Sequence, residues 1–427
     1  MLTLAVLAIL GAQGTSPGLD AVQVPVSLLR NSPLQFHVPG GASFGSAKAA
    51  RLGGQPPRAG AQSGIPGIDS IANWTGSFVV PGYDRAGNPQ SVWPYAMIGS
   101  APETAGNTSI QAPVIPVVVD LLLPDGTIAV YQGTPLSFDP TPYIGPMLQS
   151  PLFENYNFLG DVTQYTDALY RLEFADRTPG NSWHTSLVPK VKQARHVRVP
   201  FGAWIFGVDE AGHRFAAVDA NTWFALLFPP DYPFDGSTVI GAAELAGDMT
   251  THDLSLFATY NIALYFGPTH QCCVGGFHEY DFEPGVPENG NLPRLYVMAW
   301  ASWYDPGFFV FGGNDVMPFS HELAEAFHDP FLTNFTPWSL SVDPIFGFQT
   351  CEYRMEVGDI TEVLSSNPVF AAQSHGRTYH LQNEATFNWF AAQSPSRARN
   401  AAYSFPDEST LFALGPPNLT VGCKPAP

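Results

Sequence analysis

The sequence that decides the fold is NDVMPFSHELAEAFHDP, residues 314–330. Asn314 or Asp315 is suited to cap the start of a helix, and Pro330 disfavours helix at the residue before it. These signals bound a short helix of about four turns. At roughly 100° per residue, its apolar side consists of Val316, Phe319, Leu323, Ala326 and Phe327. The opposite side carries His321, Glu325 and His328.

The polar side of this helix has the spacing of a metal site. Side chains at positions i and i+4 project from adjacent turns of one face, so His321 and Glu325 can bind one cation. Zinc sites of the HExxH type use this geometry, with a glutamate beside the first ligand that acts as general base. Here the motif is HExxE, which makes His321 and Glu325 candidate ligands and Glu322 the candidate base. His328 is an alternative neutral ligand one turn further on.

A site of this kind needs a third ligand, and the best downstream source is segment 352–359. In it, Glu356 and Asp359 flank a glycine that permits a tight turn. Asp329, two turns after His321, competes for the same role. The HExxH-like geometry favours zinc, whereas a carboxylate in place of the second imidazole suits calcium, magnesium or manganese. An ordinary amphipathic helix, with a solvated polar face on which His and Glu merely pair, stays open as the alternative.

Composition bounds the class of protein. A chain of 427 residues with 45% hydrophobic residues is long enough for one large domain or two ordinary ones. Charged residues make up only 13%, while 40 glycines and 41 prolines favour short strands and many turns. We therefore expect a loop-rich α+β or mostly β fold. The net charge of −19 argues against nucleic acid or an anionic membrane surface as a partner.

Residues 1–14 form an apolar run that ends in small residues, as a secretory signal peptide does. The run lacks a basic start and is too short to span a bilayer, and an N-terminal strand is the alternative. The sequence thus predicts a secreted, extracellular or periplasmic protein without a membrane span. Residues 15–70, rich in Gly, Ser, Ala and Pro, predict a flexible leader.

Apolar runs and turn residues outline the remaining elements. Residues 114–123 predict a buried strand that forms a hairpin with residues 127–131, and residues 149–174 are more helical in character. Further strands are expected at residues 196–200, 204–208, 214–218, 260–266 and 295–301. We expect an α+β fold in which a β-rich half, 71–245, packs on a zincin-like half, 246–427, that contains the short HExxE helix. The two halves are expected to form one compact unit.

The cysteines are an even number, four, in a chain predicted to be exported, which indicates up to two disulfides. We expect the adjacent Cys272 and Cys273 to take different partners. Segment 270–280 also contains histidines, but without a paired C-x-x-C a disulfide is favoured over a metal site. His278, with Glu279, is a neighbour to consider for the active cleft. A histidine among aromatic residues is more often packed and hydrogen-bonded, so His278 is not predicted to be catalytic.

Tyr379 and His380 are reserve catalytic candidates. They lie in a strand-like run, and Tyr or His side chains commonly stabilise the oxyanion that develops in metal-assisted hydrolysis. No G-x-S-x-G elbow, P-loop or dinucleotide fingerprint opens a βα unit in this sequence. Serine hydrolases and nucleotide-dependent enzymes therefore lose support.

Several segments together resemble a known family. They are residues 321–325 with the exit Asp329-Pro330, residues 356–359, 150–154, 164–168, 273–278 and 401–407. The chain resembles, over roughly residues 110–410, a mostly uncharacterised family of secreted bacterial proteins that is distantly similar to plant phosphate-induced, EXORDIUM-type extracellular proteins. The resemblance implies an exported domain with a zincin-like HExxE helix, and no established reaction. Its plant relatives are associated with cell-wall growth. They have a cysteine soon after the E-x-G-D run, whereas Cys351 precedes that run here. They also have Asn-Pro at the helix exit, where this chain has Asp329-Pro330.

Two functions are compatible with these patterns. The first is a secreted, peptidase-like metal-dependent hydrolase in which His321, Glu325 and either Glu356 or Asp359 hold a cation and Glu322 activates water. Its substrate would be an extracellular protein or a cell-wall polymer. The second is a non-enzymatic wall- or glycan-associated protein with a structural ion or no metal, for which a row of exposed rings is expected. The tryptophans concerned are Trp74, Trp93, Trp183, Trp303 and Trp338.

Overall fold

The fold is built on a mixed sheet, seen in a computed structural model that describes most of the chain after residue 66. The described residues are 22–25, 67–80, 92–178, 182–229, 235–267, 272–309, 313–336, 340–342, 349–351, 354–365 and 367–411. The predicted signal peptide and most of the predicted leader lie outside them.

Seven strands form the central sheet, in the order β10-β3-β13-β17-β16, with β6 and β9 also paired to β3. Their bounds are β3 Gly106–Leu121, β6 Ser137–Phe138, β9 Trp183–Val191, β10 Arg195–Val199, β13 Leu254–Tyr260, β16 Gly276–Glu283 and β17 Arg294–Trp303. Strands β9, β10 and β13 run parallel to β3, and β17 runs parallel to β13. The edge strand β16 is antiparallel to β17. Strands from both sides of residue 245 therefore share one sheet.

Smaller sheets surround this one. A four-stranded sheet consists of β11 Trp204–Val208, β12 Arg214–Asp219, β14 Ile262–Tyr265 and β15 Cys272–Val274. The two-stranded pairs are β1 Asn73–Val79 with β2 Val92–Ile98, β4 Val130–Tyr131 with β5 Thr134–Pro135, β7 Tyr156–Phe158 with β8 Asp161–Thr163, β18 Leu340–Val342 with β19 Gln349–Cys351, β20 Val369–Ser374 with β21 Arg377–Gln382, and β22 Glu384–Ala385 with β23 Ser404–Phe405.

Helices are short. They are α3 Thr141–Leu148, α4 Tyr165–Glu173, α5 Ala220–Leu227, α6 Val239–Leu245, α7 Met317–His328, α8 Asp359–Leu364 and α9 Phe387–Phe390. Turns of 3-10 helix lie at Pro102–Thr104, Pro287–Asn289 and Arg399–Ala401. Among the described residues, no helix has the length and apolarity needed to cross a bilayer.

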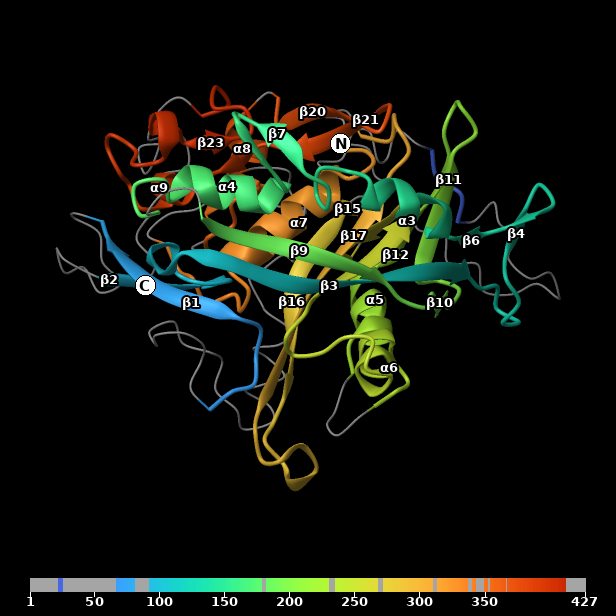
Figure 1. Ribbon diagram of the computed structural model, residues 1–427. Helices are drawn as coiled ribbons and strands as arrows, with labels where there is room; N and C mark the ends of the chain where they lie inside the picture. Colours follow the sequence, from blue (N-terminus) through green and yellow to red (C-terminus); the bar gives the residue numbers. More distant parts are fainter. Residues whose placement is uncertain are drawn as a thin grey trace.

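The central sheet separates two apolar layers, because successive strand residues point to opposite faces. On β17, Val297, Ala299 and Ala301 face the layer that contains α4, α7, α8 and α9. Met298 and Trp300, which alternate with them, face the layer that contains α5 and α6. Figure 1 shows these two groups of helices on opposite sides of the sheet. Both faces of β17 are therefore buried, as its continuous apolar run requires.

Helix α7 lies on one of these faces and is buried on every side. It packs against β2, β16, β17, β21 and α4. Pro318 stands in its first turn, where a missing N–H is tolerated, and Asp315 accepts a hydrogen bond from the Val316 N–H at 2.5 Å. All twelve residues of α7 are buried, including the polar ones. The sequence predicts the position of the helix, but the alternative of a solvated polar face is wrong, because β16, β21 and α4 cover that face.

Most of the expected elements are present. The mixed α+β class is confirmed, and α7, β10, β11, β12, β14 and β17 lie where the patterns predict helix or strand. The hairpin after β3 forms in part: Ala129 N–H donates to the Leu121 carbonyl at 2.8 Å, but regular pairing is confined to the bridge between Leu122 and Ile128. In the segment 149–174 the helix is limited to α4, since β7 and β8 intervene.

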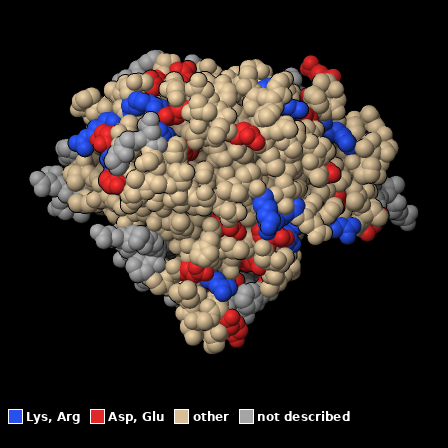
Figure 2. Space-filling view, viewed as in Figure 1, with Lys and Arg blue, Asp and Glu red and all other residues tan. Residues whose placement is uncertain are grey.

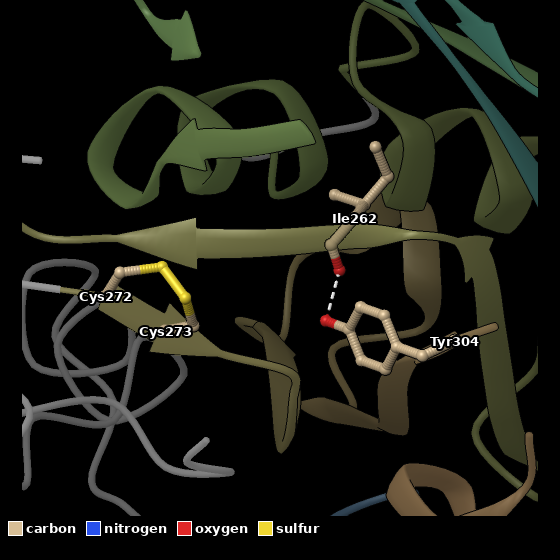
Figure 3. The surroundings of a disulfide bond; sticks show 4 residues. All are labelled: Ile262, Cys272, Cys273 and Tyr304. Carbon is tan, nitrogen blue, oxygen red and sulfur yellow. Dashed lines mark hydrogen bonds between the residues drawn. A yellow bond between two sulfur atoms is a disulfide. The ribbon is translucent and has the colours of Figure 1, made fainter. Parts of the chain in front are cut away.

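The expectation that Cys272 and Cys273 have different disulfide partners is wrong. Cys272 and Cys273 are bonded to each other on β15, next to β14, where the Tyr304 hydroxyl donates to the Ile262 carbonyl at 2.5 Å (Figure 3). Sequence adjacency suggested separate partners, but a cis peptide bond joins the two residues and their sulfurs meet. The side chain of Cys351 and the whole of Cys423 lie outside the described residues.

Few charges lie on the face of the molecule in Figure 2, where Lys, Arg, Asp and Glu are scattered over a mostly uncharged surface. Many of the acids are inside. Among the described residues between positions 279 and 384, ten carboxylate residues are buried: Glu279, Asp281, Glu283, Asp315, Glu322, Glu325, Asp329, Glu356, Asp359 and Glu384. An interior this acidic is unusual, because buried charges need partners.

We predict that Asn334→Ala lowers the free energy of unfolding by about 2–4 kcal/mol. The buried Asn334 amide accepts from Ala96 N–H at 2.8 Å and donates to the Ala96 carbonyl at 2.6 Å and to the His328 carbonyl, so it ties β2 to the end of α7. Urea denaturation is the measurement. Asn107→Ala, at an exposed position on β3, is the control and should change the value by less than about 0.5 kcal/mol; an equal effect of both substitutions contradicts the prediction.

Candidate metal centre

Three elements bring six ionisable side chains together in the interior. Helix α7 supplies three of them, the edge strand β16 supplies one, and the start of α8 with the turn before it supplies two. They are His321, Glu322 and Glu325, then His278, then Glu356 and Asp359. The exposed fraction is 0% for the three residues of α7, 2% for Glu356 and Asp359, and 6% for His278. The structure thus brings both predicted downstream carboxylates to the helix.

Two imidazoles make the closest approaches in this cluster. His321 Nε2 lies 3.0 Å from Glu325 Oε2 and 3.8 Å from Asp359 Oδ1. His278 Nδ1 lies 3.5 Å from Glu325 Oε2 and 3.6 Å from Glu322 Oε2. On the other side of its ring, His278 Nε2 lies 3.7 Å from Glu356 Oε2.

Most of these separations are too long for hydrogen bonds. Nitrogen and oxygen atoms that share a hydrogen lie about 2.7–3.2 Å apart. Two donor atoms that each bind one zinc ion at about 2.1 Å in tetrahedral geometry lie about 3.4 Å apart. The distances of 3.5 Å and 3.6 Å from His278 to the two glutamates of α7 match the second spacing better. The cluster therefore has the dimensions of a set of metal ligands.

Unsatisfied oxygens point to the same conclusion. Within the described part of the chain, neither carboxylate oxygen of Glu322 has a hydrogen-bond partner. Buried polar atoms are nearly always hydrogen-bonded, and each exception needs an explanation. A divalent cation between these oxygens and the imidazoles fits the donor set.

The ring of His321 is oriented by a neighbour on β21. Its Nδ1 lies 3.1 Å from Gln382 Oε1, and the Gln382 amide donates in turn to the Gly358 carbonyl at 2.7 Å. Because an amide oxygen only accepts, Nδ1 carries a hydrogen, and Nε2 is the nitrogen directed at Glu325. Metal-binding histidines are oriented by such outer hydrogen bonds. Gln382 is therefore a positioning residue.

Two glycines make room for the cluster. A Cβ atom on Gly358 would lie 2.3 Å from His321 Nδ1, and one on Gly276 would lie 2.5 Å from Glu322 Oε1. Gly358 has ordinary helical backbone angles, so its need is steric and not conformational. Its N–H also donates to Glu325 Oε1 at 3.1 Å. The turn predicted from this glycine thus serves close packing against the ligands.

The electrostatics distinguish the two glutamates of α7. Burial raises the pKa of Glu322 to about 8, against the opposing influence of His278 and His321. Burial also opposes ionisation of Glu325, but His321 and His278 together lower its pKa below the ordinary value. The two imidazoles have raised pKa values for the complementary reason, since the glutamates outweigh their desolvation. Glu325 is thus the anionic centre of the cluster, and Glu322 is the group most ready to take up a proton.

His328 and Asp329, the second-line candidates, have structural roles instead. His328 Nδ1 faces the Ala324 carbonyl at 2.7 Å and its Nε2 faces Glu173 Oε1 at 2.7 Å, so neither nitrogen is directed at the cluster. Asp329 Oδ1 accepts from the N–H groups of Thr333 and Asn334 at 2.8 Å and 3.0 Å. Asp329 therefore fixes the turn that follows α7.

Tyr379 and His380 are directed elsewhere. The Tyr379 hydroxyl donates to the Pro146 carbonyl at 2.8 Å. His380 Nδ1 lies 2.6 Å from Asp315 Oδ2, at the start of α7. These contacts secure the ends of α3 and α7, and they leave Gln382, on the same strand, as the β21 residue that touches the cluster.

His278 is the residue that sequence reasoning considered and set aside. On β16 it shares a face with Tyr280 and Phe282, which pack in the layer of α7. This alternation was a usable signal, but it becomes informative only when β16 is known to lie beside α7. Gln382 gave no signal of its own, because its partner is 61 residues away in the sequence.

Comparison with models of protein families, with curated proteins and with solved structures found no match for this chain. The resemblance to secreted HExxE proteins stays a prediction.

Gly358→Ala should weaken binding of zinc by at least about tenfold, the range seen when an outer-shell contact is lost. The added methyl group would displace the His321 ring, which approaches to 2.3 Å of its position. Isothermal titration of chelator-treated protein measures the affinity.

Gly145→Ala is the matched control for this substitution. Gly145 is also helical, and a Cβ atom there would meet nothing within 4 Å, so zinc affinity should not change. Unchanged affinity in Gly358→Ala would show that His321 is not a ligand.

Glu173→Gln should lower the free energy of unfolding by roughly 3 kcal/mol at about pH 6, by leaving His328 without its buried counter-charge. Burial opposes protonation of His328, but Glu173 raises its pKa above 6.5. The stabilisation by the Glu173–His328 pair is therefore complete below about pH 6.5, the ordinary pKa of histidine, and is lost as pH rises through the raised pKa of His328. Urea denaturation at several pH values should show the free energies of unfolding of the wild-type protein and Glu173→Gln converging at alkaline pH. The exposed Glu154→Gln is the control. A difference that does not depend on pH would contradict the role of the charged His328.

Proposed function

We propose that this protein is a metal-dependent hydrolase of the peptidase-like type, with a zincin-like arrangement around α7. His321, Glu325 and Asp359 hold a divalent cation in this proposal, and Glu322 is the general base. The observation that carries it is the buried Glu322 carboxylate, which has no hydrogen-bond partner among the described residues and lies beside the ligands. A glutamate with only a structural role would have its oxygens bonded.

The residues of the cluster divide the work of hydrolysis between them. A cation in this position would lower the pKa of a water molecule and polarise the substrate carbonyl. Glu322 takes a proton from the water as the water oxygen bonds to the carbonyl carbon of the substrate. As the carbon–nitrogen bond breaks, Glu322 returns that proton to the leaving amine. Gln382 keeps His321 in the tautomer that binds the cation.

The cluster is almost closed to solvent, and its least buried members are His278 and Glu356. Exposed fractions of the side chains are 4% for His278, 3% for Glu356 and 2% for Asp359, and 0% for the α7 residues. A substrate would approach across β16 and the turn before α8, with a small displacement of the side chains there. The proposed substrates are an extracellular protein or a cell-wall polymer, and secretion of the protein belongs to the same proposal.

Zinc is the cation we propose, because His321 supplies an imidazole and the helix has the HExxH-like spacing of zinc sites. Calcium, magnesium and manganese are the competitors, since oxygen ligands predominate.

A second candidate function is a non-enzymatic extracellular protein in which the cation is structural. The near-complete burial of the ligands favours it, because structural sites are closed whereas catalytic sites keep an open position. The form that binds glycans by stacking loses support: Trp74, Trp93, Trp183 and Trp303 are all buried, and Trp338 lies outside the described residues.

Glu322→Gln should retain its metal and lose peptidase activity by at least about 100-fold, since it removes the general base and not a ligand. A library of quenched fluorescent peptides measures the activity of the zinc-loaded protein, and elemental analysis measures the metal. The control is Glu283→Gln, a buried glutamate on β16 that faces Arg294 and should keep both properties.

Three results would distinguish the candidates. Full activity in Glu322→Gln, or no metal in the wild-type protein, overturns the hydrolase. Metal without activity toward any peptide, together with a large loss of stability on chelation, establishes the structural ion instead.

A further inference from the structure

Five of the six side chains of the cluster, all except Asp359, fall into two groups that share one residue. In the first group, one donor atom from each of His321, Glu322 and Glu325 lies within 4.8 Å of the other two. In the second group the same holds for His278, Glu325 and Glu356. Glu325 belongs to both, and its Oε2 lies 3.0 Å from His321 and 3.5 Å from His278.

A single ion does not use this whole set. Two donors bound to one ion at about 2.1 Å each are at most about 4.2 Å apart. The two imidazoles do not occur in the same group, although each lies close to Glu325. An ion at His321 therefore leaves out His278 and Glu356, which approach each other at 3.7 Å on the far side of the His278 ring.

We propose that the cluster binds two divalent cations bridged by the Glu325 carboxylate. His321 belongs to the first site, which is the one used in the proposed function, and Asp359 Oδ1 lies 3.8 Å from its Nε2. His278 and Glu356 belong to the second site. The inference thus rests on the proposed function and extends it to a dinuclear centre. In two-metal hydrolases the ions are about 3.5–4 Å apart, a spacing that one carboxylate can bridge.

The test counts the ions and locates them. Full-length protein is treated with chelator, loaded with Zn²⁺, freed of excess metal and analysed by mass spectrometry of the elements; crystals of the same sample are measured at the zinc edge. The expected result is two ions per chain and two anomalous peaks, one on each side of Glu325. Glu356→Gln should bind one ion and keep only the peak at His321, while the control Glu283→Gln should bind two.

The outcomes separate this inference from the function on which it rests. One ion in the wild-type protein at saturating Zn²⁺, or a second peak away from His278 and Glu356, overturns the dinuclear centre and leaves the hydrolase standing. No ion at all overturns both. If Glu356→Gln fails to fold, the ion count and the two peak positions in the wild-type protein decide the matter by themselves.

Discussion

The structure depends on one constraint: the polar face of α7 is buried against β16 and α8, with its carboxylates facing imidazoles. Burying ionised groups is unfavourable unless partners replace the water that is lost. The neighbourhood of α7 is shaped by this requirement. Gly276 and Gly358 lack side chains where Glu322 and His321 approach, and Gln382 orients the His321 ring. The apolar face of the same helix packs in the sheet layer and keeps these groups at fixed positions.

The topology of the central sheet explains how distant parts of the chain meet at this face. Strand β17 is interior to the sheet, and β16 returns antiparallel to it at the edge. Because side chains alternate along a strand, His278 faces α7 while Phe277 and Glu279 do not share that face. Strand β21 and helix α8 close the other sides of α7 and bring Gln382 and Asp359 with them.

The site was predictable where its signals are local. The HExxE spacing and Pro330 define α7, and acids around Gly358 identify Glu356 and Asp359. The predicted cap at Asn314 or Asp315 is wrong, because Val316 holds the N-cap position and no side chain caps the helix. His278 and Gln382 depend on strand positions that no local pattern reveals, so periodicity alone could not select them. The polar face of α7 was expected in water as the alternative, because amphipathicity shows which side is polar and not what covers it. The cysteine pairing failed for a related reason, since it was judged from sequence adjacency alone.

Cation binding and folding are coupled in a site of this kind. Without a cation, the carboxylates of Glu322, Glu325 and Glu356 are buried together, and positive charge on His278 and His321 and protonation of a carboxylate reduce their repulsion. The raised pKa of Glu322, about 8, expresses that tendency. A cation that binds the folded chain more tightly than the unfolded one adds its binding free energy to stability. The buried acids account for part of the net charge of −19 that does not show on the face seen in Figure 2.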